Sequence, residues 1–316
     1  MSAGTLLLTT LLLPLAGAAG IIITRHTPDV REGVTLLTST LVASCVVMIS
    51  ARFLDGEIFA FTLMEPLPGI AIAFEIEALG MLFALVAGLL WVVTSIYSIG
   101  YMRGHNEQNQ TRFFAAFAVS ISATMGIAFA ANLFTLFLFY ELLTLSTWPL
   151  VTHAGSPEAK QGGRVYLGIL LGTSIGLFLL GILVTWSLTG RVDFQEGGIL
   201  SGHIDPAWAG LLYALFLFGI GKAAVMPFHR WLPAAMVAPT PVSALLHAVA
   251  VVKAGVFTLL KVTIYIFGGD FILSNDVTGG LIWMAAATIL IASMVAMTKD
   301  NLKARLAYST VSQLSY

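Results

Sequence analysis

The sequence predicts an all-α membrane protein, a polytopic bundle of transmembrane helices. Hydrophobic residues make up 58% of the 316 residues and charged residues only 10%, whereas a soluble domain carries roughly 25% charged residues. The mean hydropathy is +0.93. The apolar residues also gather in runs of about 20, the length that a helix needs to cross the hydrocarbon core of a bilayer. We therefore expect most of the chain to lie in a membrane.

Nine such runs follow one another, and each predicts one span. The fourth and fifth share an apolar stretch that is too long for one helix, so we expect a tight turn near Ala131 and Asn132. A tenth run begins near Ala304 and meets the end of the chain before it could cross. The nine predicted spans are 5–24, 33–54, 78–100, 113–131, 132–151, 165–189, 207–227, 241–267 and 279–298.

The basic residues predict the orientation of these spans, because short cytoplasmic loops collect Lys and Arg. Loops after odd-numbered spans hold ten of the fifteen basic residues, and the loops after even-numbered spans, with the adjoining span ends, hold only Arg52 and Arg191. The other three lie within spans: Lys222, Lys253 and Lys261. We therefore expect the N-terminus to face outward, in a bacterial inner membrane.

The composition points away from several other classes of protein. The net charge is −1, which gives no sign of a nucleic-acid partner. The single cysteine, Cys45, lies in an apolar run and cannot form an internal disulfide. The chain has no GxGxxG, HExxH or CxxC motif, so we expect no bound redox cofactor and no metal.

Three ionisable residues fall near the middle of predicted spans: Glu141, Lys222 and Lys253. A charged side chain at the bilayer centre costs roughly 2.5–3.5 kcal/mol on an insertion scale, so these groups must face protein or water. One reading is structural, with Glu141 and Lys222 paired to hold helices together. Lys261 lies nearer the end of its helix, where a lysine can extend its ammonium group to the interface.

The other reading is functional. Burial makes a lysine release its proton more readily, and a carboxylate within about 4 Å opposes that release. Movement of Glu141 toward or away from Lys222 would then switch the lysine between holding and releasing a proton. His247 titrates near neutral pH, and Ser243 lies on the same helix face. The pattern equally suits a hydrogen-bonded core histidine.

Prolines interrupt the helices beside these charges. The breaks are expected at Pro227, Pro239 and Pro241, and His229 lies next to the first of them, where it is expected to make loop contacts. A broken helix is tolerated in a membrane only beside protein or a wet cavity. Discontinuous helices near buried charges are typical of transporters. The seventh span is therefore predicted to be a proline-broken crossing.

Three long motifs resemble one protein family: FYELLTLSTWPLV (139–151), GKAAVMPFHRWLPAAMVAPTPVSALLHAVAVVKAG (221–255) and NLKARLAYSTVSQLSY (301–316). They are similar to the antiporter-like membrane subunits of respiratory NADH:quinone oxidoreductase and of Mrp cation/proton antiporters. The lysine in HAVAVVKAG favours one branch, formed by the D-type protein of Mrp antiporters and the M-type protein of complex I. Ser315 departs from the family pattern, which commonly has Gly there.

The resemblance implies about fourteen helices with two inverted five-helix repeats, each with a broken helix and a proton half-channel. By matching motifs, Glu141 would be the essential glutamate of the fifth helix, Lys222 the lysine of the broken helix, and His247 and Lys253 relay positions. The further candidates for accessory roles are Ser243, Lys261, His229 and Lys303.

The resemblance also divides the chain. Residues 1–112 would form the first three spans, 113–267 the proton-channel repeat, and 268–316 the start of a second repeat. Because little of the second repeat is present, we expect this chain either to be a fragment or to need a partner for transport.

Three hypotheses follow for the function. The leading one is a proton-translocating subunit of a larger membrane complex, with other membrane subunits and lipid as partners. The chain would then not be catalytic alone but a membrane subunit of an oxidoreductase-type translocase. The second is exchange of Na⁺ or K⁺ for protons in an Mrp-type assembly. The third is a structural scaffold whose buried charges only hold helices together.

Overall fold

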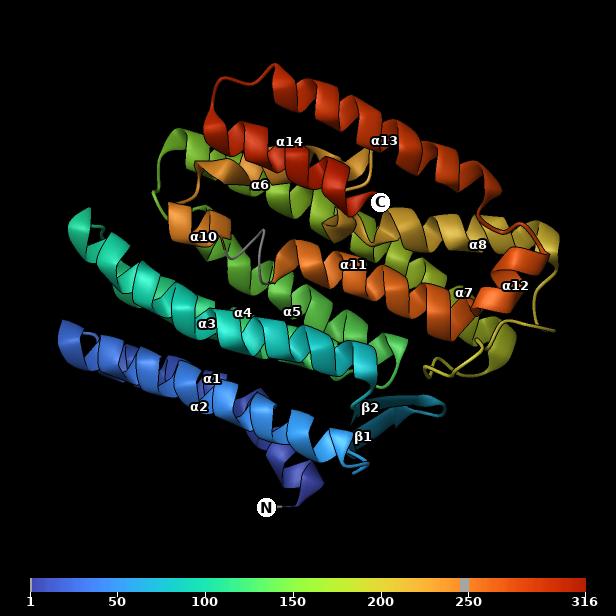
Figure 1. Cartoon of the computed structure of the whole chain (residues 1–316), viewed down its shortest axis with the longest axis horizontal. Helices are drawn as coiled ribbons and strands as arrows, with labels where there is room; N and C mark the ends of the chain where they lie inside the picture. Colours follow the sequence, from blue (N-terminus) through green and yellow to red (C-terminus); the bar gives the residue numbers. More distant parts are fainter. Residues whose placement is uncertain (1, 245–249) are drawn as a thin grey trace.

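The computed structural model describes residues 2–244 and 250–316, and the backbone alone of Leu67. It shows a bundle of helices with α1 and α2 at one edge and α13 and α14 at the other (Figure 1). In the described ranges, seven helices are long and apolar enough to cross a membrane. These are α1 (Ala3–Ile23), α2 (Pro28–Leu54), α3 (Ala78–Gly104), α4 (Gln110–Ala128), α5 (Leu133–Val151), the continuous helix Pro157–Thr189, and α13 (Gly279–Met297).

These seven helices overlap seven of the nine predicted spans. The predicted turn between the fourth and fifth spans is present, because α4 ends at Ala128 and α5 begins at Leu133. Asn132 caps α5, since its side chain accepts a hydrogen bond from the backbone N–H of Thr135 at 2.8 Å. The continuous helix consists of α6 (Pro157–Thr173), a π-helical turn at Ser174–Phe178 and α7 (Leu179–Thr189).

The two remaining predicted spans, 207–227 and 241–267, consist of shorter pieces. In the first region, α8 (Pro206–Gly219) is followed by short turns at Gly221–Ala223 and Phe228–Arg230, by α9 (Trp231–Ala234) and by a turn at Ala235–Val237. In the second, α10 (Thr240–Ala244) and α11 (Val251–Lys261) flank the residues outside the described ranges, and α11 runs into a π-helical turn at Val262–Phe267. The chain then continues through α12 (Gly269–Ser274) to α13 and α14 (Leu302–Leu314).

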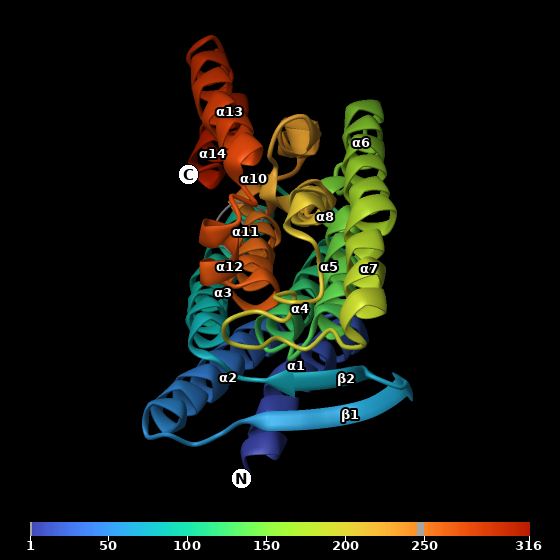
Figure 2. The same cartoon turned by 90° about the vertical axis from the view of Figure 1, so that its right-hand side faces the viewer.

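The sequence analysis did not foresee a β-hairpin between α2 and α3. Strands β1 (Ala60–Leu67) and β2 (Ile70–Glu75) pair antiparallel, with Ala60 opposite Glu75. Figures 1 and 2 place the hairpin beside the N-terminal end of α1, at the same end of the bundle as α12. Its alternating stretch GIAIAFEIE does have the period of two that is typical of a strand.

Helix α4 lies at the centre of the bundle. It packs against α1, α3 and α5, and 78% of its most apolar window is buried, whereas the figure for α13 is 17%. Small side chains and glycine let its neighbours approach, since a Cβ on Gly126 would lie 2.1 Å from the ring of Phe139 in α5. The α4–α5 pair therefore forms the packed core of the bundle, and the interrupted segment that follows α8 contacts α5.

Helix α11 also packs closely, through a glycine, against the short turn Gly221–Ala223. A Cβ on Gly255 would lie 2.3 Å from the backbone nitrogen of Ala223 and 2.4 Å from the carbonyl carbon of Lys222. Real Cβ atoms do not approach backbone so closely. A side chain at position 255 would therefore push α11 away from the broken helix.

We predict that Gly255→Ala lowers the stability of the folded protein by about 1–3 kcal/mol or more, because the added methyl group meets backbone that cannot move aside. Thermal denaturation in detergent, followed by size-exclusion chromatography, measures this change. The matched control is Gly168→Ala in α6, where an added Cβ meets nothing within 4 Å. Equal midpoints for the two variants would contradict the tight contact.

Candidate functional site: a buried lysine at a broken helix

The helix break at the end of α8 is held by close packing. A Cβ on Gly219 would lie 2.3 Å from the backbone nitrogen of Phe178 in the π-helical turn. The indole Nε1 of Trp231 donates a hydrogen bond of 2.9 Å to the carbonyl of Gly221. Ala224 has a φ of 55°, a left-handed conformation that is strained for a residue with a Cβ. The helix thus stops at Gly219, eight residues before Pro227, and the packing fixes the chain that follows.

Lys222 lies in this break and is completely buried. Its ammonium Nζ donates hydrogen bonds to the main-chain carbonyl of Tyr140 at 2.8 Å and to Oγ1 of Thr144 at 2.6 Å. The same nitrogen lies 3.2 Å from the centre of the Tyr140 ring. The hydroxyl of Tyr140 accepts a hydrogen bond of 3.1 Å from the backbone N–H of Lys222. All of these partners belong to the middle of α5, and none carries a full charge.

Glu141 follows Tyr140 on the same helix. Both carboxylate oxygens are buried and have no hydrogen-bond partner among the described residues. The two side chains do not form a direct ion pair, although Glu141 is near enough to act electrostatically on Lys222. A buried carboxylate without a partner carries a large desolvation cost. We call Tyr140, Glu141, Thr144 and Lys222 the Lys222 cluster.

The described part of the chain brings no other predicted relay or accessory residue into this cluster. His247 lies outside the described residues. The side chain of Lys253 is exposed on α11. Ser243 is buried, and its hydroxyl has no partner within the described ranges. His229 is half-buried, with its ring 6.0 Å from that of Tyr308, and its Nδ1 likewise has no partner there.

Lys303 has a structural contact. Its Nζ donates a hydrogen bond of 2.8 Å to the carbonyl of Ala238, which lies between α9 and α10. This bond ties the beginning of α14 to the chain that follows the broken helix. Pro239 and Pro241 come directly afterwards, and α10 begins at Thr240 between them.

A second buried lysine lies at the hairpin end of the bundle. Lys261 is 1% exposed, and its Nζ is 2.5 Å from Oε1 of Glu77 and 2.7 Å from the carbonyl of Ala130. Phe194 covers the ammonium group, with its ring centre 4.1 Å away. Lys261 is therefore paired within the protein and does not extend to an interface. The sequence analysis missed Glu77, although an acidic residue directly before an apolar run was visible in FEIEALG.

The Glu77–Lys261 pair lines a cavity of about 240 Å³. Glu75 and Glu196 also line it, together with Tyr265. The pair joins three separate elements, because Glu77 precedes α3, Ala130 lies in the α4–α5 turn and Lys261 ends α11. Such a pair holds these elements in register as long as both charges are present.

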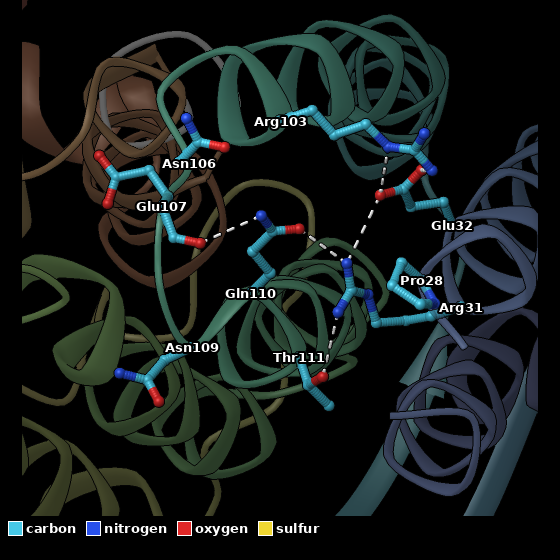
Figure 3. A pocket seen from close by; sticks show the side chains of 9 residues that line it. All are labelled: Pro28, Arg31, Glu32, Arg103, Asn106, Glu107, Asn109, Gln110 and Thr111. Carbon is cyan, nitrogen blue, oxygen red and sulfur yellow. Dashed lines mark hydrogen bonds and ion pairs between the residues drawn. The ribbon is translucent and has the colours of Figure 1, made fainter. Parts of the chain in front are cut away.

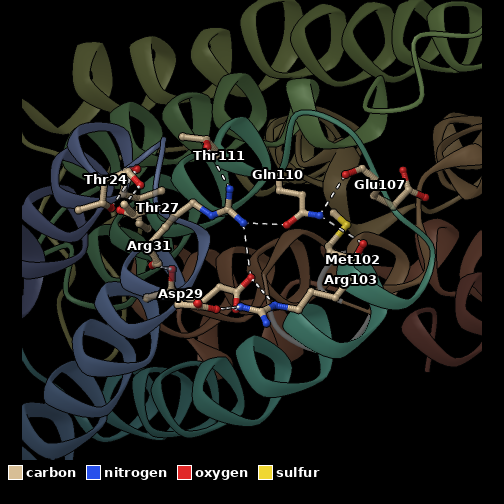
Figure 4. A network of polar contacts seen from close by, with 12 residues as sticks. Thr24, Thr27, Asp29, Arg31, Met102, Arg103, Glu107, Gln110 and Thr111 are labelled. Atoms are coloured by element: carbon tan, nitrogen blue, oxygen red, sulfur yellow. Dashed lines mark hydrogen bonds and ion pairs between the residues drawn. The ribbon is translucent and has the colours of Figure 1, made fainter.

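The opposite end of the bundle carries the loops that are rich in Arg and Lys, among them the α1–α2 loop with Arg25 and the α3–α4 loop beside Arg103 and Arg112. We call it the basic-loop end. There, a cavity of about 550 Å³ lies between the start of α2 and the loop that joins α3 to α4 (Figure 3). Arg31 is buried and donates to Gln110 Oε1 at 2.7 Å and to Thr111 Oγ1 at 3.3 Å. Arg103 donates to Glu32 at 3.0 Å and also bonds Asp29 (Figure 4). These contacts tie three helices together, although Nε of Arg31 is buried without a hydrogen-bond partner among the described residues.

The fold and the buried lysine site define a polytopic membrane subunit of the antiporter type. Residues 130–316 match the family described as NADH:quinone oxidoreductase/Mrp antiporter, transmembrane. Residues 68–114 match the N-terminus of NADH-ubiquinone oxidoreductase (complex I) chain 5. The chain therefore belongs to the NADH:quinone oxidoreductase/Mrp antiporter family, and it is an integral membrane protein. The family resemblance of the three sequence motifs is confirmed.

Individual relatives agree with this assignment. The putative antiporter subunit mnhA2 of Staphylococcus haemolyticus is 30% identical over 89% of this chain and 35% of its own length. The chloroplastic NAD(P)H-quinone oxidoreductase subunit 5 of Chlorokybus atmophyticus is 32% identical over 78% of this chain and 38% of its own length. The chain spans about a third of the length of these curated relatives. They are not from the D-type and M-type branch that the sequence motifs favoured, so the comparisons show the family and not the branch.

Two solved structures have a similar fold. A chain of the archaeal membrane-bound sulfane sulfur reductase, a respiratory membrane complex, superposes with a TM-score of 0.84 at 21% identity, over 98% of this chain and 63% of that one. A chain of the Mrp complex from Dietzia sp. superposes with a TM-score of 0.75 at 25% identity, over 97% and 33%.

We predict that Lys261→Met destabilises the protein by about 3–5 kcal/mol, because it leaves the charge of Glu77 without its partner. Lys261→Arg keeps the positive charge and is expected to retain most of the stability. Thermal denaturation of the two variants in detergent measures the difference. A Met variant as stable as the wild type would show that the pair does not hold these elements together.

Proposed function

We propose that the chain is a proton-translocating subunit of a multisubunit membrane complex and that the Lys222 cluster is its proton-holding centre. The carrying observation is a fully buried lysine whose ammonium group meets only neutral oxygens, beside a buried carboxylate that has no partner among the described residues. The relatives and solved structures are described as antiporter or oxidoreductase subunits and as parts of membrane complexes. This supports other membrane subunits as the partners of this chain.

The chemistry of the cluster suits proton transfer. An ammonium group donates three hydrogen bonds and a neutral amine can also accept one, so Thr144 can serve either form of Lys222 by turning its hydroxyl. The charged Lys222–Glu141 state and the neutral state hold the same single proton between them. A hydrated channel that reached Glu141 would stabilise its charge and so decide which state is favoured. The cluster can therefore pass one proton between Lys222 and Glu141 without moving any helix, and the proton then enters or leaves through water at either group.

The further relay positions are His247 and Lys253, with water between them and Lys222. His247 lies outside the described residues, and six positions separate it from Lys253 in the sequence. Lys253 lies on the exposed side of α11 in this chain. The relatives are about three times as long, so we propose that this face meets the rest of such a protein or another subunit.

The architecture of the proposal follows the inverted-repeat plan. Spans four to eight, within 113–267, would form the proton-channel repeat, 1–112 the first three spans, and 268–316 the start of a second repeat. In this plan the two interrupted regions count as crossings, which gives nine complete spans. The N-terminus would face outward, with the basic-loop end in the cytoplasm of a bacterium, because ten basic residues collect in those loops.

A second candidate is the exchange of Na⁺ or K⁺ for protons. The observation that favours it is the similarity to a putative antiporter subunit and to the Mrp complex. Proton release that requires added Na⁺ or K⁺ would distinguish cation exchange from proton movement alone. A scaffold without transport is the alternative from another class.

We predict that Glu141→Gln and Lys222→Ala each reduce proton flux on the order of 10²-fold, the usual loss when a positioned proton-transfer group is removed. The assay is the response of a pH-sensitive dye in proteoliposomes that contain the complex to which the chain belongs. Lys160→Ala, at an exposed lysine of α6, is the matched control and is expected to leave the flux unchanged.

The scaffold alternative gives a different result. Under it, both cluster variants lower the thermal stability of the complex while the folded fraction keeps its full proton flux. Unchanged flux per folded complex in both variants would reject the proposed function.

A further inference from the structure

His153 is a buried titratable residue that the proposed mechanism does not use. It lies just after the end of α5, in the loop before α6, and its side chain is 1% exposed. Neither ring nitrogen makes a hydrogen bond of good geometry with the described residues. Its ring packs edge-on against Phe113 of α4, with the ring centres 5.7 Å apart. A buried polar group without a partner costs roughly 1–3 kcal/mol, so its presence calls for an explanation.

The nearest acidic group connects this histidine to the basic-loop end. Nε2 of His153 is 3.8 Å from Oε2 of Glu107. Glu107 also lines the cavity of about 550 Å³, where its main-chain carbonyl accepts a hydrogen bond from Gln110. Figure 3 shows its carboxylate directed away from that contact. Glu107 is 29% exposed, so it links water at the basic-loop end to the buried imidazole.

Hydroxyl groups lie between His153 and the Lys222 cluster. Thr144 bonds the ammonium group of Lys222, and the Thr147 hydroxyl bonds the carbonyl of Thr144 at 3.2 Å. Thr147 also lies 2.5 Å from the hydroxyl of Tyr166 in α6, and all three of these side chains are fully buried. Thr147 lies one turn before the end of α5 at Val151, and His153 follows that end, so water is needed to carry a proton between the two side chains.

We propose that Glu107 and His153 form a proton-uptake site for the Lys222 cluster at the basic-loop end. The ligand is a proton taken from water. Glu107 accepts it on a carboxylate oxygen and passes it to Nε2 of His153, and the imidazolium then releases a proton from Nδ1 toward Thr147 and Tyr166. One proton enters at Nε2 and one leaves from Nδ1, which leaves the Nε2–H tautomer. A turn of the ring, or proton exchange with water, then restores the Nδ1–H tautomer before the next proton arrives. A proton moves along hydrogen bonds, so a water or a small movement of the Glu107 side chain closes the 3.8 Å between Oε2 and Nε2. Neither ring nitrogen has another hydrogen-bond partner among the described residues, which leaves both available for this relay.

The electrostatics of the site set its pH range. Burial lowers the pKa of His153 below its usual value, and the charge of Arg112 lowers it further. The Glu107 carboxylate and the nearby carbonyl of Gln108 raise the pKa of His153. Arg112 also donates a hydrogen bond of 3.0 Å to the His153 carbonyl, which fixes the backbone of the loop. The lowered pKa favours the neutral imidazole, so His153 carries a positive charge only during proton transfer.

This inference rests on the proposed function, and a matched set of variants tests it in the proteoliposomes described above. His153→Phe keeps a ring against Phe113 and removes two unpartnered nitrogens, so the protein is expected to stay folded. Its proton flux is nevertheless expected to fall on the order of 10²-fold. A purely structural histidine would give full flux in this variant. If Glu141→Gln abolishes flux and His153→Phe does not, the uptake site is wrong while the proposed function stands.

Glu107→Gln supplies the second test. Gln cannot accept the proton, and loss of the carboxylate charge lowers the pKa of His153. The flux is therefore expected to fall, and the pH of half-maximal flux to move to lower pH. The shift should follow the pH on the basic-loop side of the vesicle and not the pH on the other side. A shift that follows the opposite side, or no shift, contradicts uptake through this pair.

A stability measurement tests the titration of His153 without any transport. Because its pKa is lower in the folded protein than the unfolded value of about 6.5, the folded state takes up this proton less readily. The contribution of His153 to stability is therefore full above about pH 6.5 and falls as the pH drops below it. His153→Phe should make the thermal midpoint less sensitive to acid in this range. The same acid sensitivity in both proteins would show that His153 is not a buried titrating group.

Discussion

The removal of the Lys222 ammonium group from water is the constraint on which the rest of the site depends. An ammonium ion inside a protein loses several kcal/mol of hydration, and this cost must be met by oriented dipoles. Here the middle of α5 supplies them, through a main-chain carbonyl, a hydroxyl and the face of an aromatic ring. Because these partners are neutral, the lysine is stabilised without being locked into its charged form by a direct ion pair.

Meeting this constraint requires tight packing around an interrupted helix. Broken backbone in a membrane exposes N–H and C=O groups that lipid cannot satisfy. The indole N–H of Trp231 donates to one of these groups, the carbonyl of Gly221. Close backbone packing at Gly219 and Gly255 leaves no room for lipid beside the others. Both glycines are required because backbone lies directly against them.

The two buried lysines differ in their partners. Lys261 is paired with a carboxylate, and Lys222 is hydrogen-bonded to neutral oxygens.

Apolar run length predicted the long helices and the α4–α5 turn, and charge placement singled out Glu141 and Lys222, which form no direct ion pair in the structure. These features depend on local composition or on the cost of a single charge, which a sequence displays directly. The hairpin was missed because the search was for runs of about 20 residues and not for alternation. Glu77 and His153 were missed because their meaning depends on contacts with Lys261 and Glu107, which are distant in sequence. The end of α8 at Gly219 was set by packing against Phe178 and not by the proline that sequence rules favour.

The continuous helix from Pro157 to Thr189 has 33 residues and is about 50 Å long, whereas the hydrocarbon core of a bilayer is about 30 Å thick. Its first two turns, PEAKQGGR, are polar and can stand among the lipid head groups. The remainder still exceeds the core, and such hydrophobic mismatch is relieved by tilt. Phe178 of this helix packs directly against Gly219, at the end of α8. The contact between Phe178 and Gly219 therefore connects the tilt of this helix, which depends on bilayer thickness, with the chain that carries Lys222.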